Sequence, residues 1–312
     1  MNGRYAGDTK KDTPLPDGGG AGPSPLRITL IGHLGRMGAM LAQRWRNAGY
    51  EVRGADREAA RPCPPPLSHA APFVGHTTLR GSAPSPHTLA EAVRGAHAVA
   101  LCVPAKALSG LLDDLASALD PGQILFDITS VKMLPMEAME AAHRGPVVGT
   151  HPLFGPNPAP EDLAVAVTPG RRAGEAHIRL VEDLYAGFGC RVFRTTAEEH
   201  DRGVAFVQGL NFISSAAYLA SLARRDDVLP FLTPSFRRRL EGARKLLTED
   251  GDMFQGVTAA NPMTGDAIHT FRLFLDLVEG GGLSDVLRRA RWWYATERPD
   301  APEAGRGDAK TG

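Results

Sequence analysis

Residues 26–38 decide the fold, and they read Leu26-Arg27-Ile28-Thr29-Leu30-Ile31-Gly32-His33-Leu34-Gly35-Arg36-Met37-Gly38. A short apolar strand runs into a glycine-rich turn, and residues 39–48 then have the character of a helix that Gly49 ends. Glycines let a backbone approach a pyrophosphate, and a helix N-terminus offers free N–H groups and the positive end of a dipole. This order of strand, turn and helix predicts a dinucleotide-binding fold. The residues expected to contact the cofactor here are Gly32, His33, Leu34, Gly35, Arg36, Met37 and Gly38.

The turn departs from the GxGxxG pattern that is usual in such folds. Gly35 and Gly38 are in register with its second and third glycines, whereas His33 takes the place of the first and Gly32 precedes it. A plain tight turn between a strand and a helix is therefore the alternative interpretation.

A second strand, residues 50–55, ends at Asp56. A carboxylate at this point of a dinucleotide fold hydrogen-bonds the adenosine ribose, which favours NAD over a cofactor with a 2′-phosphate. Arg57 follows directly, and an arginine accepts a 2′-phosphate, so both cofactors stay open with NAD preferred.

Strands and helices continue to alternate up to residue 195. Strands are expected at 96–103, 123–126, 146–150, 163–168 and 190–195, and helices at 87–94, 106–119, 133–143 and 174–188. This spacing predicts an α/β fold with a Rossmann-like, doubly wound and mostly parallel sheet, forming a dinucleotide-binding domain over residues 26–195. The carboxyl ends of parallel strands share one edge, so Val103 and Pro104 are expected at the cofactor site, beside Thr129, Ser130 and His151.

One titratable residue ends a buried strand of this sheet. Residues 147–156 read Val147-Val148-Gly149-Thr150-His151-Pro152-Leu153-Phe154-Gly155-Pro156, an apolar run that stops at a histidine and then turns. Open α/β sheets bind ligands at the carboxyl ends of their strands, and the pKa of imidazole suits proton transfer near neutrality. His151 is therefore the candidate general base. A histidine that only caps the strand and bonds a loop is the alternative.

The rest of the chain divides by composition. Residues 1–25 and 299–312 lack periodicity and are expected to be disordered tails, and prolines crowd a surface insertion at 57–86. Residues 196–298 are expected to form an all-helical domain, which Thr196 and Glu199 begin as a capping box. Its helices are expected at 196–223, 234–248, 252–260, 262–279 and 283–297.

Overall composition limits the possible partners and compartment. Lys and Arg total 35, as do Asp and Glu, so charge favours neither a nucleic-acid nor a membrane partner. We see no apolar run that approaches membrane-spanning length. Cys63, Cys102 and Cys190 are widely spaced and form no CxxC pair, which indicates reduced thiols in a cytoplasmic protein and no metal site.

Two motifs of the sheet, taken together, resemble the paired signature of prephenate dehydrogenases. They are Asp127-Ile128-Thr129-Ser130-Val131-Lys132 and Gly149-Thr150-His151-Pro152-Leu153-Phe154-Gly155-Pro156. The resemblance continues through Glu199-His200-Asp201, through Gln208 and Leu210 on a long helix, and through Arg291-Trp292-Trp293, so that it covers about residues 27–293.

This resemblance implies an enzyme of tyrosine biosynthesis that oxidatively decarboxylates prephenate to 4-hydroxyphenylpyruvate, with NAD as the hydride acceptor. By the same resemblance His151 binds the ring hydroxyl and accepts its proton, Ser130 bonds substrate or nicotinamide, and Thr129, His200 and Gln208 contact substrate. A base within hydrogen-bond reach is also what hydride loss from a carbinol requires, and neither a metal nor a covalent nucleophile is needed. The helical half is similar to the family's dimerisation domain, so we expect a homodimer.

The sequence departs from the family pattern at positions that concern the substrate. Relatives often carry a further histidine where this chain has Asn211-Phe212, and an arginine of the helical domain that clamps a carboxylate has no counterpart in residues 253–267. Candidates for that cation are Arg237, Arg238, Arg239, Arg244 and Arg272. Lys132 either supports its strand end or is solvated, and we take the second interpretation.

Three alternatives to a prephenate dehydrogenase follow from these departures. They are an arogenate dehydrogenase, a non-catalytic dinucleotide-binding protein, and a hydroxyacid or imine dehydrogenase of similar architecture. A monofunctional protein is expected, because we recognise neither a chorismate-mutase segment nor a regulatory module.

Overall fold

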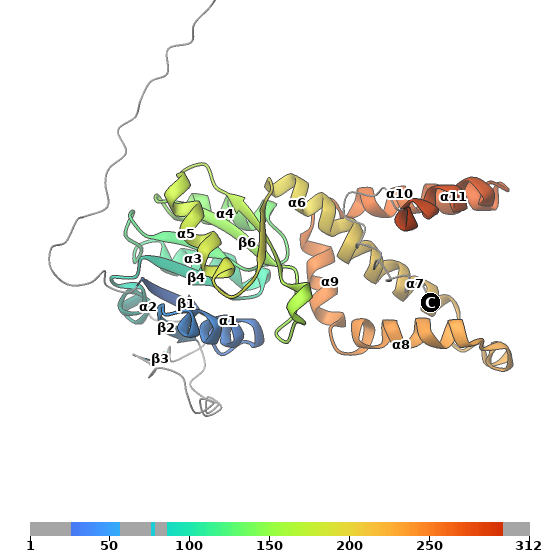
Figure 1. Ribbon diagram of the computed structural model, residues 1–312, viewed down its shortest axis with the longest axis horizontal. Helices are drawn as coiled ribbons and strands as arrows, with labels where there is room; N and C mark the ends of the chain where they lie inside the picture. The colour runs from blue at the N-terminus through green and yellow to red at the C-terminus, as the bar shows by residue number, and fades with distance from the viewer. Residues whose placement is uncertain (1–25, 57–75, 79–85, 296–312) are drawn as a thin grey trace, which may run out of the picture.

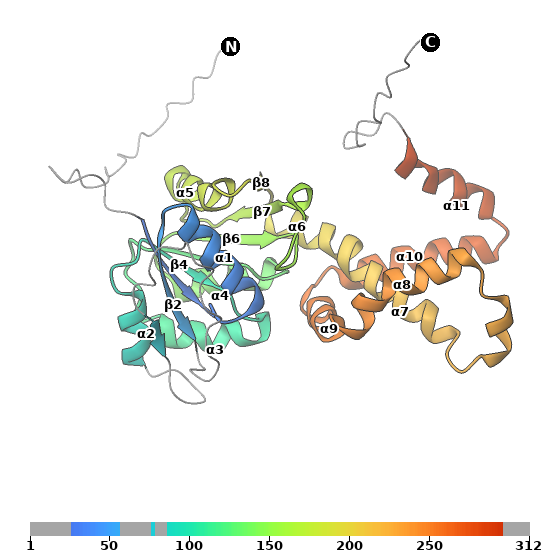
Figure 2. The same cartoon turned by 60° about the horizontal axis from the view of Figure 1, so that its bottom comes forward.

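The computed structural model of the protein describes residues 26–56, 76–78 and 86–295. The two expected tails and most of the proline-rich insertion, with Arg57 and Cys63, lie outside the described residues. An α/β part comes first along the chain, and a helical part extends away from one side of it (Figures 1 and 2).

Eight strands form one sheet in the order β3-β2-β1-β4-β5-β6-β7-β8. Their bounds are β1 Arg27–Ile31, β2 Glu51–Asp56, β3 His76–Thr78, β4 Ala98–Leu101, β5 Ile124–Asp127, β6 Val147–Pro152, β7 Ala164–Pro169 and β8 Arg191–Arg194. Strands β1 to β6 pair in parallel, β7 is antiparallel to β6, and β8 runs parallel to β7. The mostly parallel sheet is thus confirmed.

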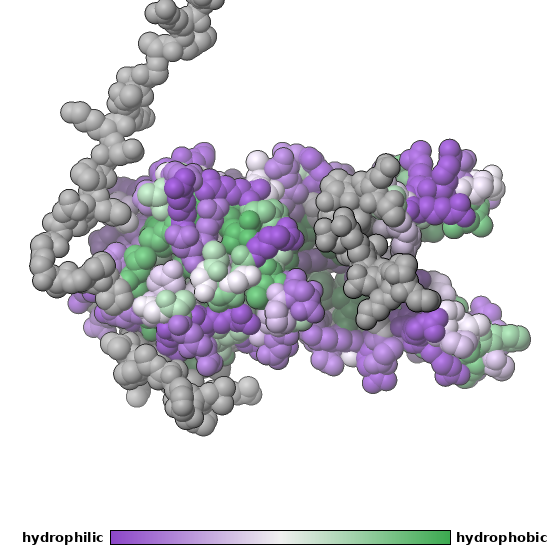
Figure 3. Space-filling model, in the orientation of Figure 1, coloured by the Kyte–Doolittle hydropathy of each residue, from purple (hydrophilic) through white to green (hydrophobic). Residues whose placement is uncertain are grey.

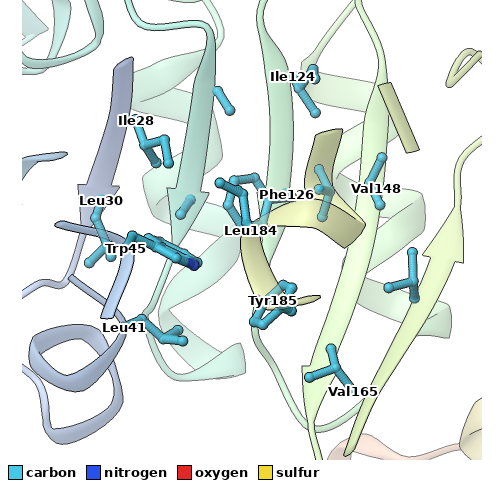
Figure 4. Close-up of a cluster of buried hydrophobic side chains, with 14 of the residues drawn as sticks. Ile28, Leu30, Leu41, Trp45, Ile124, Phe126, Val148, Val165, Leu184 and Tyr185 are labelled. Carbon is cyan, nitrogen blue, oxygen red and sulfur yellow. The ribbon is translucent and has the colours of Figure 1, made fainter. Parts of the chain in front are cut away.

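Helices cover both faces of the sheet, as in a doubly wound fold (Figure 1). Their bounds are α1 Arg36–Asn47, α2 Pro86–Val93, α3 Ala105–Leu115, α4 Met133–Ala142 and α5 Glu175–Ala186. On one face α1 and α5 pack through the fully buried Trp45 and Tyr185 (Figure 4). The Trp45 ring lies 5.9 Å from the ring of Phe126 and 6.0 Å from that of Tyr185. On the other face α2, α3 and α4 bury leucines and methionines. The sheet is therefore packed on both faces, and this packing holds its carboxyl edge in place.

The order of strands reverses between β1 and β4, whose chains leave the sheet toward opposite faces. Such a switch point is where open α/β sheets bind ligands. The glycine turn follows β1, and Val103 and Pro104 follow β4, so the predicted cofactor residues flank this point.

The helical part begins with one continuous helix of three segments. They are α6 Ala197–Val204, a π-helical turn Ala205–Leu210 and α7 Asn211–Ser221. The capping box is confirmed, because Thr196 Oγ1 accepts the Glu199 N–H at 3.1 Å and Glu199 Oε2 accepts the Thr196 N–H at 3.0 Å. The remaining elements are a 3₁₀ turn Asp226–Phe231, α8 Pro234–Thr248, α9 Gly251–Ala260, α10 Thr264–Glu279, α11 Leu283–Ala290 and a 3₁₀ turn Arg291–Tyr294.

The helix Ala197–Ser221 is long and apolar enough to cross a membrane, judged by length and composition alone. Our expectation that no apolar stretch reaches this length is wrong for this stretch. Gln208 and Asn211 interrupt the apolar residues in sequence, but an 18-residue window of the helix still has a mean hydropathy of 1.3. Only 17% of its apolar window is buried, which leaves an apolar helix with little cover.

Candidate active site

Two glycines make the turn after β1 close enough to its neighbours to form a cradle. Gly32 has a φ of +87°, and a Cβ there would lie 2.4 Å from the carbonyl oxygen of Cys102 at the end of β4. A Cβ on Gly38 would lie 2.3 Å from the carbonyl oxygen of Gly32. Any side chain would therefore push the first turn of α1 off the strand end. A backbone cradle at a helix N-terminus fits a dinucleotide pyrophosphate.

The remaining predicted cofactor residues gather around this cradle. Asp56 Oδ2 accepts the Leu34 N–H at 3.1 Å, which ties the end of β2 to the turn. His33 is accommodated because a Cβ on Gly54 of β2 would lie 2.4 Å from the His33 ring, so a small residue on the strand makes room for a large one in the turn. Pro104 is the N-cap of α3, across the switch point. Arg36 and Met37 lie in the first turn of α1 and Val103 follows β4.

His151 lies at the carboxyl end of β6, as predicted, and is 4% exposed. Its Nδ1 is 2.9 Å from Nε2 of His200, which α6 presents from the helical part. Nε2 of His151 makes no hydrogen bond to any described residue. Burial, His200 and the Lys132 ammonium lower the pKa of His151 well below its ordinary 6.5, so the ring is neutral at pH 7. A neutral imidazole with one uncommitted nitrogen is chemically a base, which is more than the strand-capping alternative requires.

Asp201 holds His200 from the other side. Its Oδ1 is 2.8 Å from His200 Nδ1, and the same carboxylate accepts the backbone N–H groups of Lys132 at 2.6 Å and Met133 at 2.9 Å. These two N–H groups are the start of α4, which lacks a side-chain cap of its own. Asn261 also donates to the backbone oxygen of Asp201 at 2.8 Å. The helical part thus docks on the sheet through the residues that reach His151.

Lys132 is not solvated, so our interpretation of it is wrong. Its side chain is fully buried, and Nζ lies 2.7 and 2.6 Å from the two carboxylate oxygens of Asp127 and 2.7 Å from the carbonyl oxygen of Thr150. Gly149 makes this possible, because a Cβ there would lie 2.9 Å from Lys132 Cδ. The buried ammonium therefore ties the end of β5 to the residue that precedes His151.

The predicted substrate residues differ in what they can offer. Ser130 is half-buried and its hydroxyl makes no hydrogen bond within the described residues, so it is available. The Thr129 hydroxyl is committed, since it donates to the Val131 carbonyl at 2.9 Å and contacts Asp127. His200 contacts His151 and Asp201, and Gln208 lies half-buried in the π-helical turn. In the described ranges no three His, Cys, Asp or Glu side chains are grouped as metal ligands.

The arginines proposed as the carboxylate clamp are all exposed on the helical part. Arg239 covers the Tyr218 ring at 4.1 Å, and Arg244 faces Glu241 at 3.4 Å. A basic side chain that the sequence analysis missed, Lys245, lines a pocket of about 340 Å³ with Arg36 and the loop that follows β6. Both cations are near Asp250, at 3.7 and 3.8 Å.

Sequence reasoning also missed Asp127, Asp201 and Asn261. Asp127 and Asp201 each lie inside a quoted motif, so their place beside Lys132 and His200 was a usable signal. No sequence signal marked Asn261, because its role depends on how α9 packs against α6.

Two family models match the sequence. The nucleotide-binding domain of prephenate dehydrogenase matches residues 84–194, and the coenzyme F420-dependent NADP oxidoreductase model matches residues 27–131. Both matches fall on the α/β part.

Several known proteins are similar to this chain. The T-protein of Enterobacter agglomerans is 29% identical over 239 residues, which are 75% of this chain and 57% of that protein. A probable arogenate/prephenate dehydrogenase of Methanocaldococcus jannaschii is 25% identical over 256 residues, 79% of this chain and 54% of that protein. The chain thus spans little more than half the length of these relatives.

One solved structure shows the same fold over nearly its whole length. Prephenate dehydrogenase from A. aeolicus, in complex with hydroxyphenyl propionate and NAD⁺, superposes with a TM-score of 0.68 at 18% identity. The likeness covers 88% of this chain and 98% of that one, and so includes the helical part.

Proposed function

We propose that the chain is a member of the prephenate/arogenate dehydrogenase family and that it catalyses the NAD-dependent oxidative decarboxylation of prephenate to 4-hydroxyphenylpyruvate. One observation carries the proposal. His151 is buried at the strand edge of a dinucleotide fold, its pKa is lowered, and its Nε2 is uncommitted while Nδ1 is held by His200. This is what the base for a carbinol needs.

In the proposed reaction, His151 Nε2 accepts the proton of the ring hydroxyl as the carbon–hydrogen bond breaks and a ketone forms. NAD⁺, when bound, takes up the hydride. The bond to the ring carboxylate then breaks, carbon dioxide leaves, and the electron pair of that bond makes the ring aromatic and the oxygen a phenolate. The protonated His151 returns its proton to that phenolate, so charge and atoms balance. In this proposal the Ser130 hydroxyl, which makes no hydrogen bond within the described residues, bonds the substrate or the nicotinamide.

The residues around the cradle fit the cofactor. Gly32 and Gly38 let the turn pack directly against the end of β4 and the start of α1, at whose N-terminus a pyrophosphate would bind. The Asp56 carboxylate lies where the adenosine ribose is held in such folds. Strands β1 and β6 are three strand spacings apart, about 14 Å, so an extended dinucleotide reaches from the glycine turn toward His151. The acid group at position 56 favours NAD over NADP.

The experiment that tests this function follows NADH absorbance with purified protein. We expect turnover with NAD and prephenate, slower turnover with arogenate, and little with NADP. Turnover with arogenate in preference to prephenate assigns the second substrate of the family. NAD binding without turnover of either substrate would contradict the enzyme hypothesis and support a non-catalytic dinucleotide-binding protein.

Replacement of Gly38 by alanine tests the cofactor cradle. The added Cβ meets backbone atoms at 2.3 and 2.9 Å, which cannot move independently, so we expect NAD affinity to fall at least about tenfold, or about 1.4 kcal/mol. Calorimetric titration with NAD measures the loss. Gly110→Ala, where the new Cβ meets nothing within 4 Å on α3, is the matched control and should bind NAD as wild type does. Equal affinity in both variants contradicts the cradle.

We propose that the protein is a homodimer formed through its helical part. Large apolar side chains remain exposed there, among them Phe231 at 79% and Leu273 at 54%, and Figure 3 shows apolar atoms at the outer ends of this part. Large exposed apolar patches mark interfaces. A second copy that supplies the same helices covers them, including the apolar helix Ala197–Ser221.

The unbonded thiols Cys102 and Cys190 are consistent with a cytoplasmic location.

Sedimentation of the purified protein at micromolar concentration measures this assembly. We expect twice the chain mass of 33.2 kDa for wild type and a shift to monomer for Leu273→Asp. Leu134→Asp, at an equally exposed leucine on α4 (55%), is the control and should stay dimeric. A wild-type monomer at this concentration contradicts the proposed homodimer.

A further inference from the structure

We propose that Asp201 is a positioning residue that, through His200, fixes the proton of His151 on Nδ1 and so leaves Nε2 as the base. The proposal concerns the site to which the proposed function assigns proton transfer, and it rests on that function for its kinetic consequence. Asp201 itself touches neither substrate nor cofactor. Its effect passes through one imidazole to another, from the helical part to the sheet.

The direction of each hydrogen bond follows from the groups involved. The Asp201 carboxylate already accepts two backbone N–H groups at the start of α4, at 2.6 and 2.9 Å, and a helix N-terminus favours a negative charge. An ionised carboxylate only accepts, so the 2.8 Å contact requires a proton on His200 Nδ1. In the proposed arrangement this is the single ring proton of His200, which leaves a lone pair on Nε2.

The second step fixes His151 in the same way. The lone pair of His200 Nε2 lies 2.9 Å from His151 Nδ1, so it accepts a proton from that nitrogen. A neutral His151 with a proton on Nδ1 has none on Nε2. Two neutral rings and one carboxylate therefore give a single arrangement of protons, and it is the one in which His151 can accept the hydroxyl proton of a substrate.

The charged and titratable groups that face His151 act consistently with this arrangement. They are His200 and Asp201 from α6, Lys132 from the start of α4, and Asp127 from the end of β5, which Lys132 neutralises. The Lys132 ammonium disfavours a second proton on His151. The Asp201 carboxylate determines which ring nitrogen holds the single proton. Lys132 and Asp201 are both fully buried.

Nitrogen NMR tests the proposal without any enzymatic activity. In wild-type protein labelled with ¹⁵N-histidine, long-range proton–nitrogen spectra distinguish protonated from unprotonated ring nitrogens, and His151→Asn and His200→Asn variants assign the two residues. At neutral pH we expect a proton on Nδ1 and none on Nε2 in both rings. A proton on Nε2 of His151 in the wild-type protein overturns the proposal, whatever the substrate proves to be.

Asp201→Asn supplies the kinetic arm. Asp201 Oδ1 accepts the Lys132 N–H and contacts His200 Nδ1, whereas Oδ2 accepts the Met133 N–H, so an asparagine cannot keep all three contacts. With its NH₂ group in the place of Oδ1 it donates to His200, which reverses both tautomers and puts the proton of His151 on Nε2. The nitrogen spectra of the variant identify this orientation. The equivalent carboxylate-to-amide change in a serine-protease triad lowers kcat about 10⁴-fold, and we expect a loss of about 10³-fold or more at neutral pH, smaller at high pH, with NAD affinity unchanged.

The control is Thr196→Ala, which removes the exposed cap of the same helix. It should lower thermal stability through a loss of about 1 kcal/mol and leave the histidine nitrogen signals as in wild type. If Asp201→Asn behaves like Thr196→Ala, with lower stability and an unchanged pH profile, Asp201 is structural and the proposal is wrong. An inactive wild-type protein with the expected nitrogen signals would instead contradict the proposed function alone.

Discussion

Replacement of His151 by asparagine is expected to lower kcat for prephenate by about 10²–10⁴-fold, the usual contribution of a general base. The asparagine amide lies near the position of the lost Nδ1, so it still donates to His200, while Nε2 and its lone pair are gone. NAD affinity should hold, because the cradle lies three strands away. Steady-state NADH formation and calorimetric titration with NAD measure the two quantities.

His97 offers a matched control at the other end of the sheet. It lies just before β4, is exposed, and accepts the Arg27 N–H through Nδ1 at 3.0 Å. His97→Asn should keep wild-type kcat. If His151→Asn turns over as fast as His97→Asn, another residue is the base.

The pH dependence of the proposed activity in the wild-type protein gives an independent check on His151. Its pKa is lowered below 6.5 in the folded protein, so the ring is neutral, and active as a base, down to that lowered pKa. We therefore expect kcat/KM to fall with acid only below the ordinary pH range of histidine. The same shift means that the unfolded chain binds a proton first as pH falls, so this residue contributes less stability below about pH 6.5.

The sequence was sufficient to predict what depends on local pattern. The strand and glycine turn at 26–38 and the strand that ends at His151 each carry their structure in consecutive residues, and their alternation with helices dictates a mostly parallel sheet. No local sequence pattern indicated that β7 pairs with β6 in the antiparallel direction. Strands β6 and β7 are both buried apolar runs, and only the path of the chain after Pro156 decides the direction in which they pair.

What the sequence did not reveal lies in contacts between distant segments. Lys132 looks like a surface lysine until Gly149, Asp127 and Thr150 are brought around it, because its burial depends on a glycine in another motif. In the sequence Asp201 looks like an ordinary acidic residue on a helix. It caps α4 only because the helical part docks on the α/β part. In both cases a charged residue has its function only in the partners that the fold supplies.

Loss of Lys132 should have the largest effect on stability. Lys132→Met removes the ammonium and leaves the Asp127 carboxylate buried without its cation, at 0% exposure, and breaking a buried pair in this way costs about 3–5 kcal/mol. Urea unfolding measures the change. The sheet edge that carries Thr150 and His151 also loses its tie to β5, so we expect lower kcat as well.

The double variant Asp127→Asn/Lys132→Met separates charge from packing. It leaves no buried charge unpaired and should recover most of the lost stability, since a buried pair replaced as a whole is often nearly neutral. The Lys132 ammonium is one cause of the lowered pKa of His151, so its removal raises that pKa and moves the acid limb of kcat/KM to higher pH. A double variant as unstable as Lys132→Met would show that the alkyl chain over Gly149, rather than the ion pair, holds the strand end. An acid limb that stays in place would show that the ammonium does not act on the base.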